Sequence, residues 1–271
     1  MSARSRLSRE VRCSIIGIGD TESALRSSRG NTHAGWPSQG QLAGGAWTVR
    51  VEVEGVPDPR TGYLVGIDRI DAAVREHAIP RLVEAAAEGP LTGPGAVRLI
   101  AESIDGPLQP KADAVMLKTE PMSWWRVESV DMSRTLFRRR YEFSASHRLH
   151  LPELDDEANA ELFGKCSNPN GHGHNYEVEV QVAVGDGSEA MSVAELDRVV
   201  DRVVIDRFDH KHLNLDLEDF RDRVASVENI AARCVDLLVD PIGELGEAVR
   251  LEAVTVWETP RTSCTVTAPN P

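Results

Sequence analysis

The histidines of this 271-residue chain are unevenly distributed, with six of the eight between residues 147 and 212. His172 and His174 are separated by one glycine and lead into residues 176–184, where apolar and polar side chains alternate as in a β-strand. Side chains two residues apart on a strand point to the same face, so these two imidazoles can reach one ion. The spacing therefore indicates a metal site, although an isolated histidine is more often an ordinary exposed or hydrogen-bonded side chain.

A third imidazole is available from His147, which ends a strand-like segment at residues 141–147. If this segment forms a hairpin with residues 176–184, His147 comes to lie beside the first two histidines. Three histidines with one open position are typical of a catalytic zinc site, so Zn²⁺ is the metal that we expect. Cys166 could instead supply a fourth ligand, which makes a closed structural zinc site the alternative.

Two further groups have the chemistry for proton transfer. The thiol of Cys166 would become a base or a nucleophile if a nearby cation lowered its pKa. Asp209 directly precedes His210, and a carboxylate beside an imidazole suits a proton relay, whereas the ordinary explanation is a charge pair at a helix end. For His212 we prefer that ordinary explanation.

The rest of the second half predicts the elements that must position these groups. A helix is expected from about Ser192, because apolar residues recur at helical intervals: Val193, Leu196, Val199, Val200 and Val203. A second helix should begin after Ser226, a suitable N-cap, and end at Pro241. Strand-like segments follow at residues 254–260 and 263–266.

The first half repeats this plan. It has a strand-like segment at residues 47–53, a helical pattern with apolar positions at Val65, Ile67, Ile70, Val74 and Leu82, and two closing strand-like segments at 115–121 and 124–127. The second helix of this half, around residues 95–103, is less regular. Each half thus reads strand, strand, helix, helix, strand, strand. A boundary near residues 131–135 predicts two α+β domains, 1–133 and 134–271.

Composition limits the partners and the location. The formal net charge of −13 disfavours nonspecific binding to nucleic acid, while leaving room for a local basic pocket that takes a phosphorylated small molecule. No apolar run reaches membrane-spanning length or resembles a signal peptide, so we expect no membrane partner and a cytoplasmic location. The four scattered cysteines are expected to be reduced.

Several motifs together carry a family resemblance. The run LFGKCSNPNGHGHNY at residues 162–176 resembles the signature of the 6-pyruvoyl-tetrahydropterin synthases. FSASHRL (143–149), FDHKHLNLD (208–216), SVENIA (226–231) and VWET (256–259) occur in the family's order. The resemblance spans about residues 136–268. It implies the tunnelling fold (T-fold), a four-stranded antiparallel sheet with two helices between strands two and three, here as tandem domains.

The resemblance also implies roles for individual residues. His147, His172 and His174 match zinc ligands, and Glu258 matches the carboxylate that anchors the pterin ring. Three other residues match the catalytic groups of the family: Cys166, Asp209 and His210. The implied substrate is 7,8-dihydroneopterin triphosphate, which loses triphosphate in the reaction. Family members associate into barrels, so a homo-oligomer with active sites at domain interfaces is expected.

Two alternatives stay open beside the pyruvoyl-forming lyase. The 6-carboxytetrahydropterin synthases of queuosine biosynthesis share the substrate and the zinc site, but they usually have a shorter gap than the five residues between Cys166 and His172. A folate-linked branch replaces the cysteine by glutamate, which this chain does not do. The other alternative is a noncatalytic pterin-binding protein, since a fold by itself does not establish an activity.

The first half departs from the family where the chemistry should be. Pro80 and Arg81 align with Asp209 and His210, and the stretch GWPSQGQLAGGA before Trp47 has no paired histidines and no cysteine. Only Glu120 is predicted to be retained, opposite Glu258. We therefore expect a degenerate first domain that binds no zinc and lacks the catalytic residues.

Overall fold

The computed structural model describes residues 3–15, 45–89, 91–185 and 191–269. The chain divides into two compact units, the first built mainly from residues up to 138 with 183–194, the second mainly from 139–182 and 195–271. Each unit is described by itself below. His33 and the stretch at residues 35–44, where the counterpart of the histidine pair was sought, lie outside the described residues.

The first unit contains an antiparallel sheet in the order β1-β2-β3-β4. Its strands are β1 (Ser5–Ile15), β2 (Gly45–Gly55), β3 (Ala114–Glu120) and β4 (Ser123–Glu128). The alternating pattern of β2 puts Trp47, Val49 and Val51 on one face, where each is at most 2% exposed. This apolar face requires a cover.

Helices supply that cover for the first sheet. The chain forms α2 (Ile67–Ala72), a π-helical segment η1 (Ala73–Ala78) and α3 (Ile79–Glu88), then α4 (Gly93–Asp105). Ile70, Val74 and Leu82 are fully buried as expected, but Ile67 is 52% exposed and lies off the buried face. The irregular pattern around residues 95–103 belongs to α4, whose N-terminus is capped by the Thr92 hydroxyl accepting from Gly95 N–H at 3.2 Å.

The second unit has the sheet that carries the histidines, in the order β5-β6-β8-β9. Its strands are β5 (Asp131–His147), β6 (His172–Val184), β8 (Val249–Thr259) and β9 (Thr262–Thr267), and the two-residue β7 (Lys211–His212) pairs in parallel with β5. The expected neighbouring of β5 and β6 is confirmed. β5 is longer than expected, because it begins directly after the turn that follows β4.

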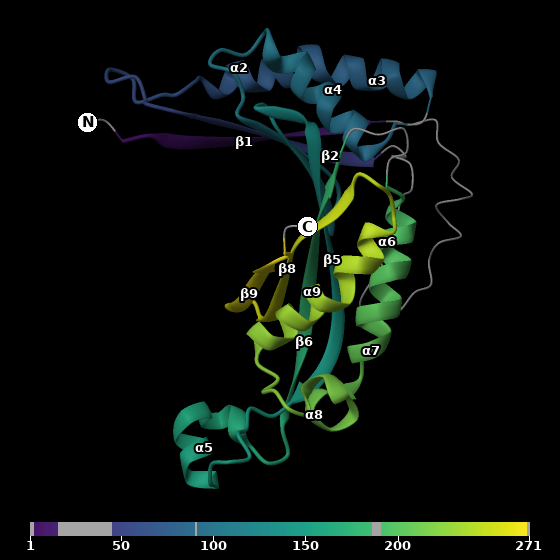
Figure 1. Cartoon of the computed structure of the whole chain (residues 1–271). Helices are drawn as coiled ribbons and strands as arrows, with labels where there is room; N and C mark the ends of the chain where they lie inside the picture. The colour runs from purple at the N-terminus through teal and green to yellow at the C-terminus, as the bar shows by residue number, and fades with distance from the viewer. Residues whose placement is uncertain (1–2, 16–44, 90, 186–190, 270–271) are drawn as a thin grey trace. The chain divides into compact units, whose positions relative to one another are not determined.

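Helices lie along one face of this second sheet (Figure 1). The first run comprises α6 (Val193–Val200), the π-helical η3 (Asp201–Ile205) and α7 (Asp206–Phe208). The wider π turn adds a residue, so Val204 is buried where regular spacing had placed Val203. A π-helical segment therefore interrupts the first helix in both units.

The long helix α9 (Val227–Gly243) packs against β8 and β9. It begins as expected, with the Ser226 hydroxyl accepting from Asn229 N–H at 3.4 Å. The predicted stop at Pro241 is wrong by two residues. A proline so close to the end of a helix removes a single hydrogen bond, which the last turn tolerates.

Shorter helices fill the connections at the histidine-bearing end of the sheet. They are α5 (Asp156–Phe163), the 3₁₀ segment η2 (Gly164–Ser167), α8 (Leu213–Asp216) and the 3₁₀ segment η4 (Glu218–Phe220). Figure 1 shows α5 beyond the ends of β5 and β6. The buried amide of Asn159 ties this connection together, because it accepts from Leu151 N–H and donates to Leu151 O.

Each unit thus combines a four-stranded antiparallel sheet with helices inserted between its second and third strands, the α+β arrangement that was predicted. Within the described residues, no helix is long and apolar enough to cross a membrane.

Candidate active site

Three histidines and one glutamate form a compact cluster at the end of the second sheet. One potential ligand atom from each of His147, His172, His174 and Glu258 lies within 4.8 Å of all the others. The Nε2 atoms of His147 and His172 are 3.1 Å apart. Tetrahedral zinc with Zn–N bonds of about 2.0–2.1 Å holds its nitrogens roughly 3.3 Å apart. The histidine spacing therefore suits a small divalent cation.

The orientation of His147 is fixed from behind. Its Nδ1 lies 2.6 Å from the backbone carbonyl oxygen of Ala225, just before α9, so Nδ1 carries the proton and donates it. Nε2 then presents its lone pair to the cluster, as is usual for metal-ligating histidines. Burial lowers the pKa of His147 to about 4, with a smaller contribution from the neighbouring imidazoles. The fully buried ring is therefore neutral at physiological pH, the form that binds metals.

The other two imidazoles have polar atoms without partners. Nδ1 of His172 and Nε2 of His174 are buried and make no hydrogen bond. His174 Nε2 faces Glu258 Oε1 at 3.4 Å, and both side chains are less than a fifth exposed. Buried polar atoms without partners are uncommon, and a cation inside the cluster would satisfy those that face it.

A β-bulge directs Glu258 toward the cluster. The register of β8 and β9 shifts between Trp257, which pairs with Ser263, and Thr259, which pairs with Thr262. Glu258 is the extra residue. Bulges change the direction in which a side chain points and are frequent beside active sites. The four-group cluster is therefore completed by Glu258, and Cys166 is not part of it.

Cys166 lies on η2, in the connection between β5 and β6. Its carbonyl oxygen accepts from Leu149 N–H at 2.9 Å, which holds this connection against the end of β5. Burial raises the pKa of the Tyr176 hydroxyl, and the negative charges of Glu258 and then of Cys166 raise that pKa further.

The predicted acid and imidazole pair follows α7 directly. His210 Nδ1 lies 2.7 Å from Asp209 Oδ2, while Asp209 Oδ1 accepts from Ser144 N–H at 2.8 Å. His210 has a φ of +57°, which a non-glycine residue adopts only when its surroundings impose it. Its own N–H donates to Ser144 O at 2.6 Å. β5 thus holds both residues of the pair, and the imidazole remains 72% exposed.

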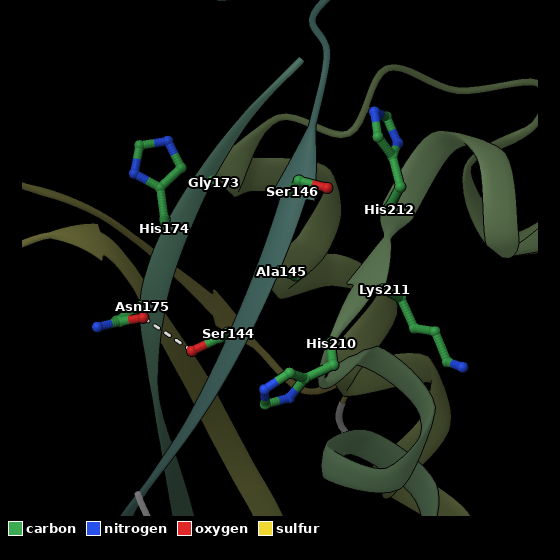
Figure 2. Close-up of a pocket in the computed structure, with 9 residues that line it drawn as sticks. All are labelled: Ser144, Ala145, Ser146, Gly173, His174, Asn175, His210, Lys211 and His212. Carbon is green, nitrogen blue, oxygen red and sulfur yellow. Dashed lines mark hydrogen bonds between the residues drawn. The ribbon is translucent and has the colours of Figure 1, made fainter. Parts of the chain in front are cut away.

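The pair faces an open pocket of about 470 Å³. Figure 2 shows β5 in the middle, with His174 on one side and His210 and His212 on the other. Ser144 Oγ donates to Asn175 Oδ1 at 2.8 Å across this pocket. His174 and His210 both line it, whereas Cys166 does not. The pocket is therefore shared by one residue of the cluster and one of the pair, whereas the remaining members, His147, His172, Glu258 and Asp209, are not among the residues that line it.

Comparisons with known proteins bear on this half of the chain. A family model described as 6-pyruvoyl tetrahydropterin synthase matches residues 136–269. The 6-pyruvoyl tetrahydrobiopterin synthase of Pongo abelii is 47% identical over 113 residues, 40% of this chain and 77% of that protein. The chain belongs to the 6-pyruvoyl tetrahydropterin synthase family. The human 6-pyruvoyl tetrahydrobiopterin synthase is 46% identical over 113 residues, which are again 40% of this chain and 77% of that protein.

Membership of the synthase family makes the chain an enzyme, with the matched residues all in its second half. Among solved structures, the 6-pyruvoyl tetrahydropterin synthase of Caenorhabditis elegans is similar, with 35% identity and a TM-score of 0.46. That match covers 50% of this chain and 96% of the other.

Several residues beside the candidate site were not predicted from the sequence. Ser144 and Asn175 line the pocket, Tyr176 lies beneath the histidines, and the side chain of His212 lines the pocket as well. We expected the His212 side chain to form a charge pair at a helix end. The contact with an acid is made instead by its backbone N–H, which donates to Asp216 Oδ2 at 2.7 Å. The HGHNY signature contains both Asn175 and Tyr176, and strand alternation puts Tyr176 on the same face as His172 and His174, so the spacing carried a signal for Tyr176.

The first unit differs from the candidate site at the corresponding positions that the structure describes. Pro80 and Arg81 lie inside α3, where the helix continues past the point at which α7 ends. The β3–β4 hairpin shifts register between Lys118 and Glu120, just as β8–β9 does around Glu258, so Thr119 is the bulged residue. The residue that corresponds to Glu258 is therefore Thr119 and not Glu120, the residue that was predicted. Within the described ranges, the histidine cluster of the second unit is the only potential metal-binding group.

Proposed function

We propose that this chain is a zinc-dependent 6-pyruvoyl-tetrahydropterin synthase that converts 7,8-dihydroneopterin triphosphate with loss of triphosphate. The observation that carries the proposal is the cluster of three histidines with Glu258, in a segment 46–47% identical to named synthases. His147, His172 and His174 would hold the ion. Bound there, zinc would act as a Lewis acid that acidifies C–H bonds next to the substrate's side-chain hydroxyls.

The chain's own residues would then move the protons. In this proposal Cys166, as a thiolate, removes and returns protons on the substrate side chain. Asp209 accepts the Nδ1 proton of His210, which fixes the tautomer and leaves Nε2 free to accept a proton in the pocket. Hydrogen bonds from β5 hold the pair in place before substrate arrives.

Glu258 is proposed to anchor the pterin ring. A carboxylate can accept two parallel hydrogen bonds from the ring's amino group and adjacent N–H, as it does from a guanidinium. Its position on the bulge beside His174 would place the ring next to the ion, with the side chain of the substrate above the histidines.

A complete site is proposed to need a second chain. His210 lines the pocket and Cys166 does not, although both match catalytic residues of the family. A homo-oligomer in which neighbouring chains supply these groups to one site resolves that separation. The first domain, proposed to comprise residues 1–133, would be a copy without metal or catalytic residues that serves as a structural partner of the catalytic domain 134–271. The π-helical segment and the hairpin bulge found in both units support common descent.

Product analysis tests the activity. Zinc-loaded protein is incubated with 7,8-dihydroneopterin triphosphate, and pterins and triphosphate are measured by mass spectrometry. We expect the pyruvoyl product and one triphosphate per turnover. A carboxypterin product would instead place the chain in the queuosine branch, and a folded, metal-replete protein without turnover would favour a pterin-binding role.

Substitution of the thiol tests the assignment of roles. Cys166→Ala should lower kcat by about 10²–10⁴-fold, the usual contribution of a general base, while leaving zinc content unchanged. Cys264→Ala, on β9, is the matched control and should keep full activity. Loss of zinc from Cys166→Ala would show that the thiol is a ligand in a closed site.

A further inference from the structure

A second pocket of about 500 Å³ lies in the same unit and is rich in basic side chains. It is formed by the residues that follow β5 and by the chain between β7 and α9. We call it the basic pocket, and the side chains that define it are Arg148, His150, His212, Arg221 and Arg223. Its volume is that of an ordinary small-molecule site.

The charge of the basic pocket is opposite in sign to that of the chain. Three guanidiniums line it against two carboxylates, those of Glu153 and Asp222, whereas the chain as a whole has a formal net charge of −13. Arg221 is 68% exposed and only weakly paired, with its Nη1 at 3.3 Å from Glu218 on η4. A cationic pocket in an acidic protein attracts anions selectively.

One of the arginines is held in place. The Nε of Arg148 donates to the carbonyl oxygen of Ser167 at 2.8 Å, and its backbone N–H donates to Asn214 Oδ1. Its Nη2 is 3.7 Å from Asp156, a carboxylate that is itself 91% exposed. The backbone of Ser167, the residue after Cys166, thus orients the guanidinium of Arg148. No buried ion pair neutralises its charge, because Asp156 is exposed.

Two histidines line the pocket beside the arginines. Nδ1 of His150 and Nδ1 of His212 are both buried, and neither makes a hydrogen bond. Such atoms are rare in folded proteins because their desolvation is uncompensated. Each ring could turn and donate a hydrogen bond to the oxygens of an anion bound in the pocket, which agrees with the ligand class that the arginines indicate.

The basic pocket adjoins the candidate active site. Arg148 directly follows His147, and His212 lines both pockets. A Cβ atom added to Gly171 would lie 2.8 Å from His212 Nε2 and 2.8 Å from His147 O, so His212 packs next to the backbone of a metal ligand. A substrate bound at the histidines could therefore extend into the basic pocket.

We propose that the basic pocket binds the triphosphate end of the substrate, an inference that rests on the proposed function. Arginine suits this role because its planar fork matches phosphate oxygens and stays charged at every physiological pH. Arg221 and Arg223 lie between the motifs at residues 208–216 and 226–231, and the triphosphate is proposed to bind to them.

Binding of inorganic triphosphate to the zinc-loaded full chain tests this proposal by calorimetry. The double variant Arg221→Gln and Arg223→Gln should bind triphosphate roughly 10- to 100-fold more weakly, the loss expected for charge-assisted hydrogen bonds. It should raise KM for the phosphorylated substrate by a similar factor, with kcat unchanged and binding of unphosphorylated 7,8-dihydroneopterin unaffected. The matched control is Arg198→Gln with Arg202→Gln, which removes two exposed arginines from the α6 and η3 helical run and should bind triphosphate as wild type does.

The outcomes separate this proposal from the proposed function. Unchanged triphosphate binding by the double variant would overturn the proposal that the basic pocket binds triphosphate, even if the enzyme converts its substrate. Weakened binding in a protein that shows no turnover would uphold the pocket and overturn the function. An equal loss in the control variant would mean that the anion responds only to net charge, and would also overturn the proposal.

Discussion

At the scale of single residues, Gly171 has a position that no other residue type fits. Its φ is +69°, and an added Cβ would lie 2.8 Å from the backbone carbonyl oxygen of His147, which cannot move without displacing a proposed metal ligand. We expect Gly171→Ala to destabilise the fold by about 1–3 kcal/mol and to weaken zinc binding.

The matched control is Gly164→Ala. Gly164 also has a positive φ, +56°, but nothing lies within 4 Å of an added Cβ. It should cost a similar amount of stability, measured by chemical denaturation, while zinc affinity, measured by competition with a chelator, stays at the wild-type value. A Gly171→Ala protein that binds zinc as tightly as wild type would show that the contact does not position His147.

Histidine spacing predicted the cluster at this scale because strand periodicity is local. His172 and His174 share a face by geometry alone, and His147 needed only one strand pairing. Tyr176 shares that face by the same alternation, whereas His212 could not be found in this way, because its position depends on contacts between segments far apart in the sequence. Glu258 was found through family resemblance, and the bulge that directs it leaves no periodic signal.

At the scale of elements, a buried carboxylate joins three helical segments. Asp219 on η4 accepts from Arg207 on α7 at 2.9 Å and from Arg233 on α9 at 2.6 Å, and its side chain is 1% exposed. Burial by itself would raise the pKa of Asp219, but the two arginines outweigh it and hold that pKa below its usual value. This contact fixes the segment that forms one wall of the basic pocket.

Removal of that carboxylate should be costly and pH-dependent. Because the folded pKa is lower than the unfolded value of about 3.9, the stabilisation is present above that pH and is lost as pH falls through the folded pKa. We expect Asp219→Asn to lower the free energy of unfolding by roughly 2–4 kcal/mol at pH 7, with the difference from wild type shrinking toward pH 3.

Urea denaturation between pH 3 and pH 7 measures this difference. Asp236→Asn is the control, since Asp236 is 56% exposed and lies 3.8 Å from the same Arg233. It should change stability by less than about 1 kcal/mol. Equal stability of Asp219→Asn and wild type at pH 7 would contradict the account.

Helix and strand positions were mostly predictable, and their ends less so. Ser226 marked the start of α9 because its hydroxyl accepts from Asn229 N–H, a contact within one turn. The π segment in the α6–α7 run was invisible, because regular helical spacing places Val203 inward where the wider turn buries Val204. Ile67 was predicted to be buried, but it is exposed. A periodic pattern does not show at which residue of a helix the buried face begins.

At the scale of the whole molecule, the chain contains two units of the same plan, and within the described residues only the second unit has a group that could hold a metal ion. The repeat was visible in the sequence because both halves use the same order of strands and helices. Its divergence was visible too, since Pro80 and Arg81 replace the acid and imidazole pair. The residue opposite Glu258 is Thr119, which follows both from aligning VMLKTEP (115–121) with VTVWETP (254–260) and from the register of the β3–β4 hairpin.

The dependence of turnover on bound zinc decides whether the chain has a single zinc-dependent site. Metal-free protein is titrated with zinc, and formation of pterin product from 7,8-dihydroneopterin triphosphate is followed at each step, with bound zinc counted by native mass spectrometry. We expect no activity without zinc and a linear rise that stops at one zinc per chain. Full activity in the metal-free protein, or a plateau reached only at two zinc ions per chain, would contradict a single zinc-dependent site in the second half.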